Sequence, residues 1–103
     1  MLHLLVADGN DRAGRETHLS VCDKTSAETY AGILHALAPD AVCHLVAPAD
    51  AGAVLPRALS DCDALVLTGS TLHVEDGGPA VTRQCDLVRA ALEAGVPVFG
   101  SCW

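Results

Sequence analysis

Four short apolar runs divide this sequence, and they constrain its fold more than any other feature. They cover residues 2–7, 41–46, 64–67 and 96–99. Each run is continuous rather than alternating, which is typical of strands that are covered on both faces in a parallel sheet. With 103 residues, half of them hydrophobic, the chain can bury one modest core. We therefore expect one domain, or part of one, built on a parallel sheet.

The segments between the runs carry helix signals. Residues 25–28 match a capping box, and the residues after it have helical apolar spacing as far as Pro39. Pro79 begins another helix, which Gly95 ends. On this later helix we predict a buried face made of Val81, Cys85, Val88 and Leu92. Residues 50–59 are interrupted by a proline, so we expect only a short helix or a turn there.

The alternation of strands and helices predicts an α/β fold, a doubly wound parallel sheet of the flavodoxin-like type that is truncated after its fourth strand. Two connections are longer than such units need, namely residues 8–24 and residues 68–78. We expect both to be loops, with His18 in the first. Both follow the carboxyl ends of strands, which is the edge where open α/β sheets bind their ligands.

Charge and composition exclude several kinds of function. The net charge is −7, from 13 acidic and 6 basic residues, so nucleic acid is not an expected partner. No apolar run approaches the roughly 18 residues of a membrane span, and no export signal begins the chain. The five cysteines form no C-x-x-C pair, so we expect no metal and no cofactor. Unclustered cysteines in an odd number fit a cytoplasmic protein with reduced thiols.

The end of the fourth run has the pattern of a nucleophile elbow. A strand that leads into G-x-nucleophile-x-G makes a strained turn, and the nucleophile then projects at the start of the next helix. Gly100 supplies the first glycine and Cys102 occupies the nucleophile position. A helix N-terminus favours thiolate over thiol, and thiolate is the attacking species. The alternative is that Cys102 is a buried structural cysteine.

An oxyanion hole is expected at the same edge. Gly69 follows the third run, where a glycine lets backbone N–H groups approach a ligand without a Cβ in the way. The second donor is the N–H of Trp103, since the residue after an elbow nucleophile points its N–H at the developing oxyanion. The alternative for Gly69 is an ordinary turn glycine.

Two segments resemble the class I glutamine amidotransferases. Residues 63–70 resemble the loop after the third strand in that family, and residues 95–103 resemble its elbow. Residues 8–10 and 73–76 resemble stand-alone members related to the glutaminase part of GMP synthase. The likeness covers the whole chain but only about the first half of the family's domain, so residues 1–103 are identified as the N-terminal part of a single domain.

The resemblance implies hydrolysis of the glutamine side-chain amide. Cys102 would form a thioester, Gly69, Ser70 and Trp103 would form the oxyanion hole, and Gly100 and His73 would border the substrate. Ammonia would pass to a synthetase or another acceptor domain. The family's general base is a histidine, with a glutamate two residues later, downstream of the nucleophile. Neither follows Cys102 in this sequence, so the 103-residue chain alone is expected to be inactive, with an unpaired sheet edge that favours aggregation.

Other functions remain open to different degrees. The spacing of Gly9 and Gly14 imitates a P-loop but lacks the lysine and hydroxyl residue, and it does not match a dinucleotide fingerprint. Thr68 stands where a phospho-receiver would carry aspartate. A γ-glutamyl peptide hydrolase, or another cysteine hydrolase of the same fold, shares the elbow. A binding module in which Cys102 only packs in the core is the alternative outside enzymes.

Overall fold

The computed structural model of this chain describes residues 1–70, 72–73, 75 and 77–100. Helices and strands alternate along it in the order that the sequence predicts, with one additional helix. The elements are β1 (His3–Ala7), α1 (Arg12–Cys22), α2 (Ser26–Leu37), β2 (Val42–Val46), the 3-10 turn η1 (Leu59–Asp61), β3 (Ala64–Leu67), α3 (Pro79–Glu93) and β4 (Val98–Gly100).

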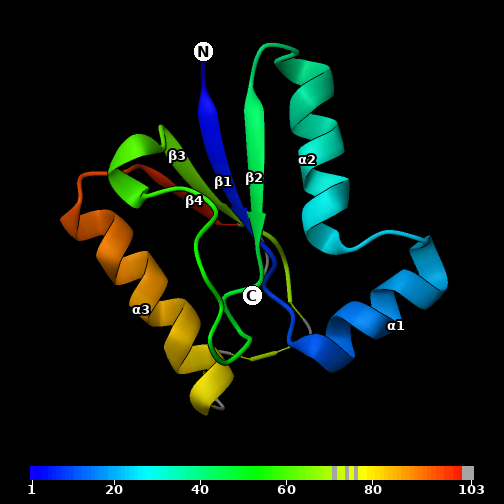
Figure 1. Cartoon of the computed structure of the whole chain (residues 1–103). Coiled ribbons are helices and arrows are strands. Elements are labelled where there is room, and N and C mark those ends of the chain that lie inside the picture. Colours follow the sequence, from blue (N-terminus) through cyan, green and yellow to red (C-terminus); the bar gives the residue numbers. More distant parts are fainter. Residues whose placement is uncertain (71, 74, 76, 101–103) are drawn as a thin grey trace.

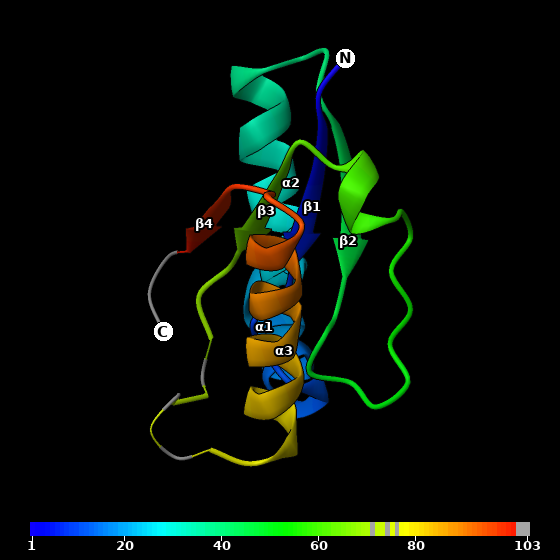
Figure 2. The same ribbon diagram turned by 90° about the vertical axis from the view of Figure 1, so that its left-hand side faces the viewer.

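The four strands of the described region form one parallel sheet in the order β2-β1-β3-β4. This order is that of a flavodoxin-like sheet, which confirms the predicted fold class. Helices cover both faces, with α2 on one side and α3 on the other (Figure 1). Figure 2 shows α3 running along its face of the sheet. The fold is therefore doubly wound.

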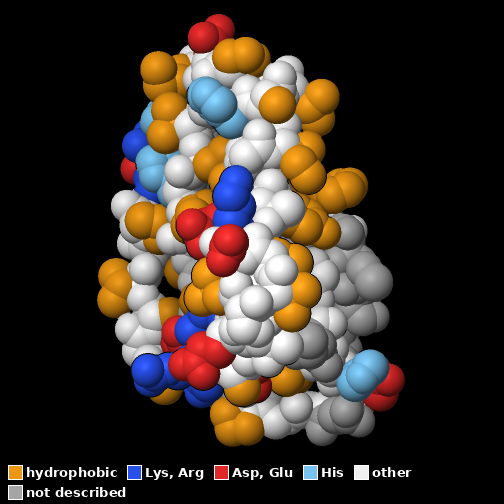
Figure 3. Space-filling model, turned by 90° about the vertical axis from the view of Figure 1, so that its right-hand side faces the viewer, with side chains coloured by type: hydrophobic (Ala, Val, Ile, Leu, Met, Phe, Trp, Pro, Cys, Tyr) orange, Lys and Arg blue, Asp and Glu red, His pale blue; other side chains and the backbone are white. Residues whose placement is uncertain are grey.

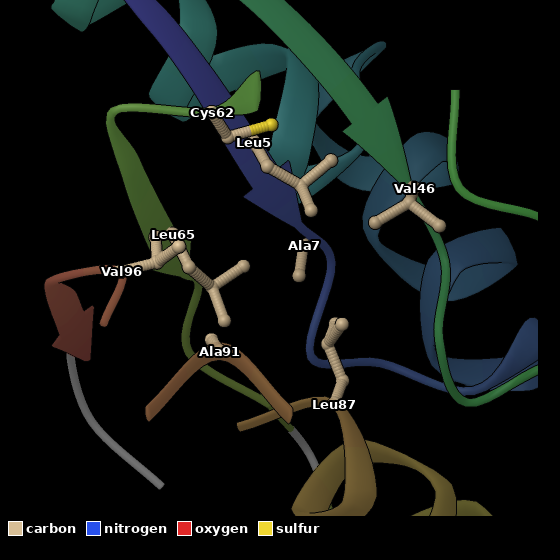
Figure 4. Packing of buried hydrophobic residues seen from close by; sticks show 8 residues of the cluster. All are labelled: Leu5, Ala7, Val46, Cys62, Leu65, Leu87, Ala91 and Val96. Atoms are coloured by element: carbon tan, nitrogen blue, oxygen red, sulfur yellow. The ribbon is translucent and has the colours of Figure 1, made fainter. Parts of the chain in front are cut away.

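The two faces of the sheet bury separate apolar clusters. On the α3 face, Leu5 and Leu65 pack with Leu87 and Ala91 from the helix (Figure 4). On the α2 face, a smaller cluster is formed by Val6, Ala27 and Val66, with Tyr30, Leu34 and Cys43 packed against it. Residues 5 to 7 of β1 have no exposed surface, because β1 lies between two neighbouring strands and between two helical layers.

Helix α1 corrects the expectation that residues 8–24 form a loop, and it places His18 in a helix. Asp11 begins the helix by accepting the N–H of Gly14 at 2.9 Å, and Asp23 ends it in the left-handed conformation, at φ 61°. Gly14 is the only buried residue of α1. Helix α1 therefore has no buried apolar stripe that a periodicity search could detect, since it depends on its caps rather than on packing against the sheet.

The buried face of α3 also differs from the predicted one. It consists of Val81, Gln84, Leu87 and Ala91, whereas the predicted Cys85 is exposed and Leu92 is 63% exposed. Both sets have helical spacing, and the true one is offset by about one residue around the helix. The buried face includes the polar residue Gln84. Apolar periodicity alone therefore predicts a different face of the helix.

The outer strands are less covered than their apolar sequences predict. Leu45 on β2 is 41% exposed and Phe99 on β4 is 63% exposed, because each of these strands has one neighbour in the described sheet. On the face that carries α1 and α2, exposed hydrophobic side chains are interspersed with charged ones and histidines (Figure 3). Among the helices described, none is long and apolar enough to cross a bilayer.

The capping box at the start of α2 is confirmed. The hydroxyl of Thr25 accepts the N–H of Glu28 at 3.1 Å, and the carboxylate of Glu28 accepts the N–H of Thr25 at 3.0 Å. Two interactions with Thr25 hold the pKa of Glu28 below its ordinary value of 4.5. The larger is the hydrogen bond from the backbone N–H of Thr25, and the smaller is the hydrogen bond with the Thr25 side chain. A carboxyl with a lowered folded pKa contributes stability above its unfolded pKa, and this contribution is lost as the pH falls.

Replacing Thr25 with alanine is expected to lower the free energy of unfolding by about 1 kcal/mol at neutral pH, because the N–H of Glu28 loses its acceptor, the Thr25 hydroxyl. Urea denaturation measures the change. Thr29→Ala is the matched control, since that hydroxyl only bonds the carbonyl of Thr25 within the helix. The cost of Thr25→Ala should shrink below pH 4.5, and an undiminished cost there would contradict the role of Glu28.

Candidate functional site

The carboxyl ends of three strands meet at one edge of the sheet. Ala7 at the end of β1 pairs with Leu67 on β3, and Leu67 pairs with Gly100 at the end of β4. The loops that begin at Asp8 and Thr68 therefore leave the sheet side by side. In Figure 1 the strands run toward the end of the molecule where α1 lies. This is the edge at which the sequence predicted the site.

The two loops are joined through Gly9. Its N–H donates to Oγ1 of Thr68 at 2.8 Å, and its carbonyl accepts from Oγ of Ser70 at 2.6 Å. Thr68 is fully buried. A Cβ at Gly9 would lie 2.9 Å from the carbonyl oxygens of both Thr68 and Gly69. Only glycine therefore allows the first loop to approach the predicted oxyanion loop so closely.

Asp8 anchors the first loop to α2. Its carboxyl group is buried, and it accepts the N–H of Ala27 at 3.0 Å, in the first turn of the helix. The other oxygen accepts the N–H of Asn10 at 3.0 Å and the side-chain amide of Asn10 at 3.2 Å. A carboxylate at a helix N-terminus with these donors is stabilised in place. Asp8 therefore positions the loop.

Helix α3 contributes a buried amide to the same place. Gln84 is 2% exposed, and its Nε2 donates to the carbonyl of Gly9 at 3.1 Å. The carbonyl of Gly9 thus accepts from two side chains, Gln84 and Ser70, that come from different elements. Three segments that are far apart in the sequence converge on one peptide group.

Two backbone N–H groups of the predicted oxyanion loop have no acceptor among the described residues. In the described structure, neither the N–H of Gly69 nor that of Ser70 donates to a protein acceptor. The hydroxyl of Ser70 instead bonds Gly9 and accepts the N–H of Leu72 at 2.9 Å. Ser70 therefore ties the predicted oxyanion loop to the neighbouring loop.

The other predicted site residues divide into two groups. Gly100 ends β4 beside Leu67, at the expected edge. The side chain of His73 is 65% exposed, with Nδ1 3.9 Å from Oε1 of Glu75. Cys102 and Trp103 lie outside the described residues, so the elbow and its oxyanion donor stay predictions.

The remaining thiols and histidines lie away from this edge or at the surface. Burial raises the pKa of the thiols of Cys43 and Cys62, whereas Cys22 and Cys85 are exposed. The rings of His3 and His44, in adjacent strands, stack with centroids 5.3 Å apart. Across the described chain, no three His, Cys, Asp or Glu side chains form a group that could hold a metal ion.

A groove of about 320 Å³ lies beside the site, between α3 and the segment that follows β2. Its lining includes Asp50 and Arg83. Arg83 donates to the carbonyl of Ala49 through two nitrogens, at 2.9 and 2.6 Å, and Asp50 pairs with Arg15 at 2.7 Å. These charged groups brace the loop after β2 against α1 and α3.

Sequence reasoning missed three members of this network, namely Asp8, Thr68 and Gln84. Each joins segments that are distant in the chain, so no local pattern identifies its partner. A signal did exist for Gln84, because it lies three residues after Val81 and three before Leu87, on the stripe that packs against the sheet. A polar residue within a buried stripe needs a hydrogen-bond partner, and this one is the loop of the site.

This chain is similar to a known hydrolase. A gamma-glutamyl-L-1-hydroxyisopropylamide hydrolase from a Pseudomonas species is 28% identical over 102 residues. The match covers 99% of this chain and 35% of the relative, so the chain spans about a third of that protein's length. No family model matches the chain, and no solved structure matches it significantly.

Proposed function

We propose that this chain carries the nucleophile-bearing part of a cysteine hydrolase that cleaves γ-glutamyl amides, as the glutaminase domains of class I glutamine amidotransferases do. The observation that carries the proposal is the meeting of three strand ends at one edge, where the glycine-containing loop after β3 lies beside the strand that leads to Cys102. The similarity to a γ-glutamyl amide hydrolase supports the same chemistry.

In this mechanism the thiolate of Cys102 attacks the side-chain carbonyl carbon of the substrate. The N–H groups of Gly69 and Trp103 stabilise the negative charge that develops on the carbonyl oxygen. The C–N bond then breaks, the amine takes up a proton and leaves, and a γ-glutamyl thioester remains. Water hydrolyses the thioester to glutamate and restores the thiol. In the class I glutamine amidotransferases, a histidine and a glutamate downstream of the nucleophile serve as the base and its orienting partner.

Two substrate classes fit the proposed site. With glutamine the leaving group is ammonia, which would pass to a synthetase or another acceptor. With a γ-glutamyl N-alkylamide the leaving group is an alkylamine, and the name of the Pseudomonas relative favours this class. Comparing ammonia release from glutamine with amine release from γ-glutamyl isopropylamide would distinguish the two substrates.

Selective labelling tests the proposal. The protein expressed from its complete reading frame is treated with a glutamine analogue that carries a diazoketone in place of the amide, and labelled peptides are identified by mass spectrometry. Cys102 should be labelled saturably, and glutamine or a γ-glutamyl amide should protect it. The exposed thiols Cys22 and Cys85 are internal controls. Equal labelling at all three positions, or no protection, would refute an activated nucleophile.

A further inference from the structure

Gln84 is a polar residue on a helix face that is otherwise apolar. It is 2% exposed, and the other buried residues of α3 are Val81, Leu87 and Ala91. Burying a primary amide costs free energy unless its donors and acceptor are paired. An apolar side chain of similar length would fill the same space without this cost, so the amide requires an explanation beyond packing.

The hydrogen bonds of Gln84 use only one end of its amide. Nε2 donates to the carbonyl of Gly9 at 3.1 Å and to that of Ala80 at 3.4 Å. Because both neighbours are carbonyl oxygens, the nitrogen must face them, and the amide cannot be reversed. Oε1 is buried and has no hydrogen-bond partner in the described region. The orientation that lets Nε2 donate therefore leaves Oε1 without a hydrogen-bond partner in the described region.

The carbonyl that Gln84 holds is the junction between the two loops of the candidate site. Gly9 accepts the hydroxyl of Ser70 at the same oxygen, and its N–H reaches Thr68. A shift of the Gly9 peptide would therefore move the segment that contains Gly69. Helix α3 is packed on the sheet, and Gln84 connects it to this segment through the carbonyl of Gly9.

We propose that Gln84 is a positioning residue for the amidase chemistry: by holding the Gly9 carbonyl, it orients the backbone of Gly69 and Ser70 toward the oxyanion of a γ-glutamyl substrate. This inference rests on the proposed function. The donor of Gln84 acts through Gly9 and does not touch the substrate. Oxyanion donors act on the transition state, so a misplaced loop lowers kcat more than it changes KM.

The test uses Gln84→Met and Ser70→Ala, singly and together, in the protein expressed from its complete reading frame. Gln84→Met should lower kcat about tenfold with KM within about twofold, since small displacements of catalytic donors are costly. Its Tm should not fall, because methionine fills the space and removes the unpaired Oε1. The double variant should lose less than the product of the single losses, because both side chains hold one oxygen.

Gln84→Glu supplies a second readout. A carboxylate would face two carbonyl oxygens, whereas a protonated carboxyl can donate to Gly9, so the ratio of variant to wild-type kcat should rise as the pH falls. Thr82→Val, on the exposed side of the same helix, should leave kcat and Tm unchanged. A wild-type kcat for Gln84→Met, or a loss of Tm that accounts for its lower activity, would overturn the inference.

Failure of the proposed function is detected separately. If wild-type protein hydrolyses no γ-glutamyl amide, the amidase assignment fails, and backbone amide exchange still tests the positioning. Gln84→Met should then accelerate exchange at the bonded N–H groups of Gly9 and Leu72 while exchange in α2 stays constant. Unchanged exchange at both residues would refute the role of Gln84 independently of any enzymatic activity.

Discussion

Replacing Cys102 with alanine is expected to lower kcat/KM for γ-glutamyl amide hydrolysis by about 10⁴-fold or more, because no thioester can form without the sulfur. The variant should still bind substrate, since the oxyanion donors belong to the backbone. Steady-state release of ammonia or alkylamine from the protein of the complete reading frame measures the loss, and isothermal titration with substrate measures the binding.

Two other cysteines are matched controls for this prediction. Cys22 ends α1 and Cys85 lies on α3, and both are exposed. Cys22→Ala and Cys85→Ala should keep wild-type turnover, since both thiols are exposed on helices and neither is part of the hydrogen-bond network that joins the two loops. Cys62 is less suitable, because it is buried in the core and alanine would leave a cavity there. Substantial turnover by Cys102→Ala would exclude covalent catalysis by this residue.

The strands and the capped helix α2 were predictable because their signals are local. A strand such as β1, covered on both faces, is apolar along its length, and a capping box needs only Thr25 and Glu28. Helix α1 was not predictable from apolar periodicity, because only Gly14 is buried in it. Its local signal was Asp11, whose side chain caps the first turn.

The edge of the candidate site was predictable, whereas its network was not. Parallel strands end at one edge of their sheet, which places Gly69 and Gly100 there, and the continuous apolar runs predict such a sheet. The bonds that shape the loops span 59 residues between Gly9 and Thr68 and 75 between Gly9 and Gln84. Such pairings depend on three-dimensional packing, and each residue alone is compatible with many partners.

The consequence of this network is that the site depends on a residue with no side chain. Gly9 has no positive φ, so backbone freedom does not explain the glycine. The lack of space explains the glycine, because an added Cβ would lie 2.9 Å from the carbonyl oxygens of Thr68 and Gly69, and 3.1 Å from the Cβ of Ser70. Two of these three atoms belong to the backbone, so relief requires the loops to separate.

Gly9→Ala is therefore expected to lower kcat about 100-fold, because separating the loops displaces the Gly69 donor, and to lower the free energy of unfolding by about 2 kcal/mol through overpacking. Kinetics and urea denaturation measure the two effects. Gly32→Ala is the matched control: a Cβ at this exposed position of α2 meets no atom within 4 Å, so alanine should keep kcat and raise stability by about 0.5–1 kcal/mol. If both variants kept wild-type kcat, the contact between the loops at Gly9 would have no part in catalysis.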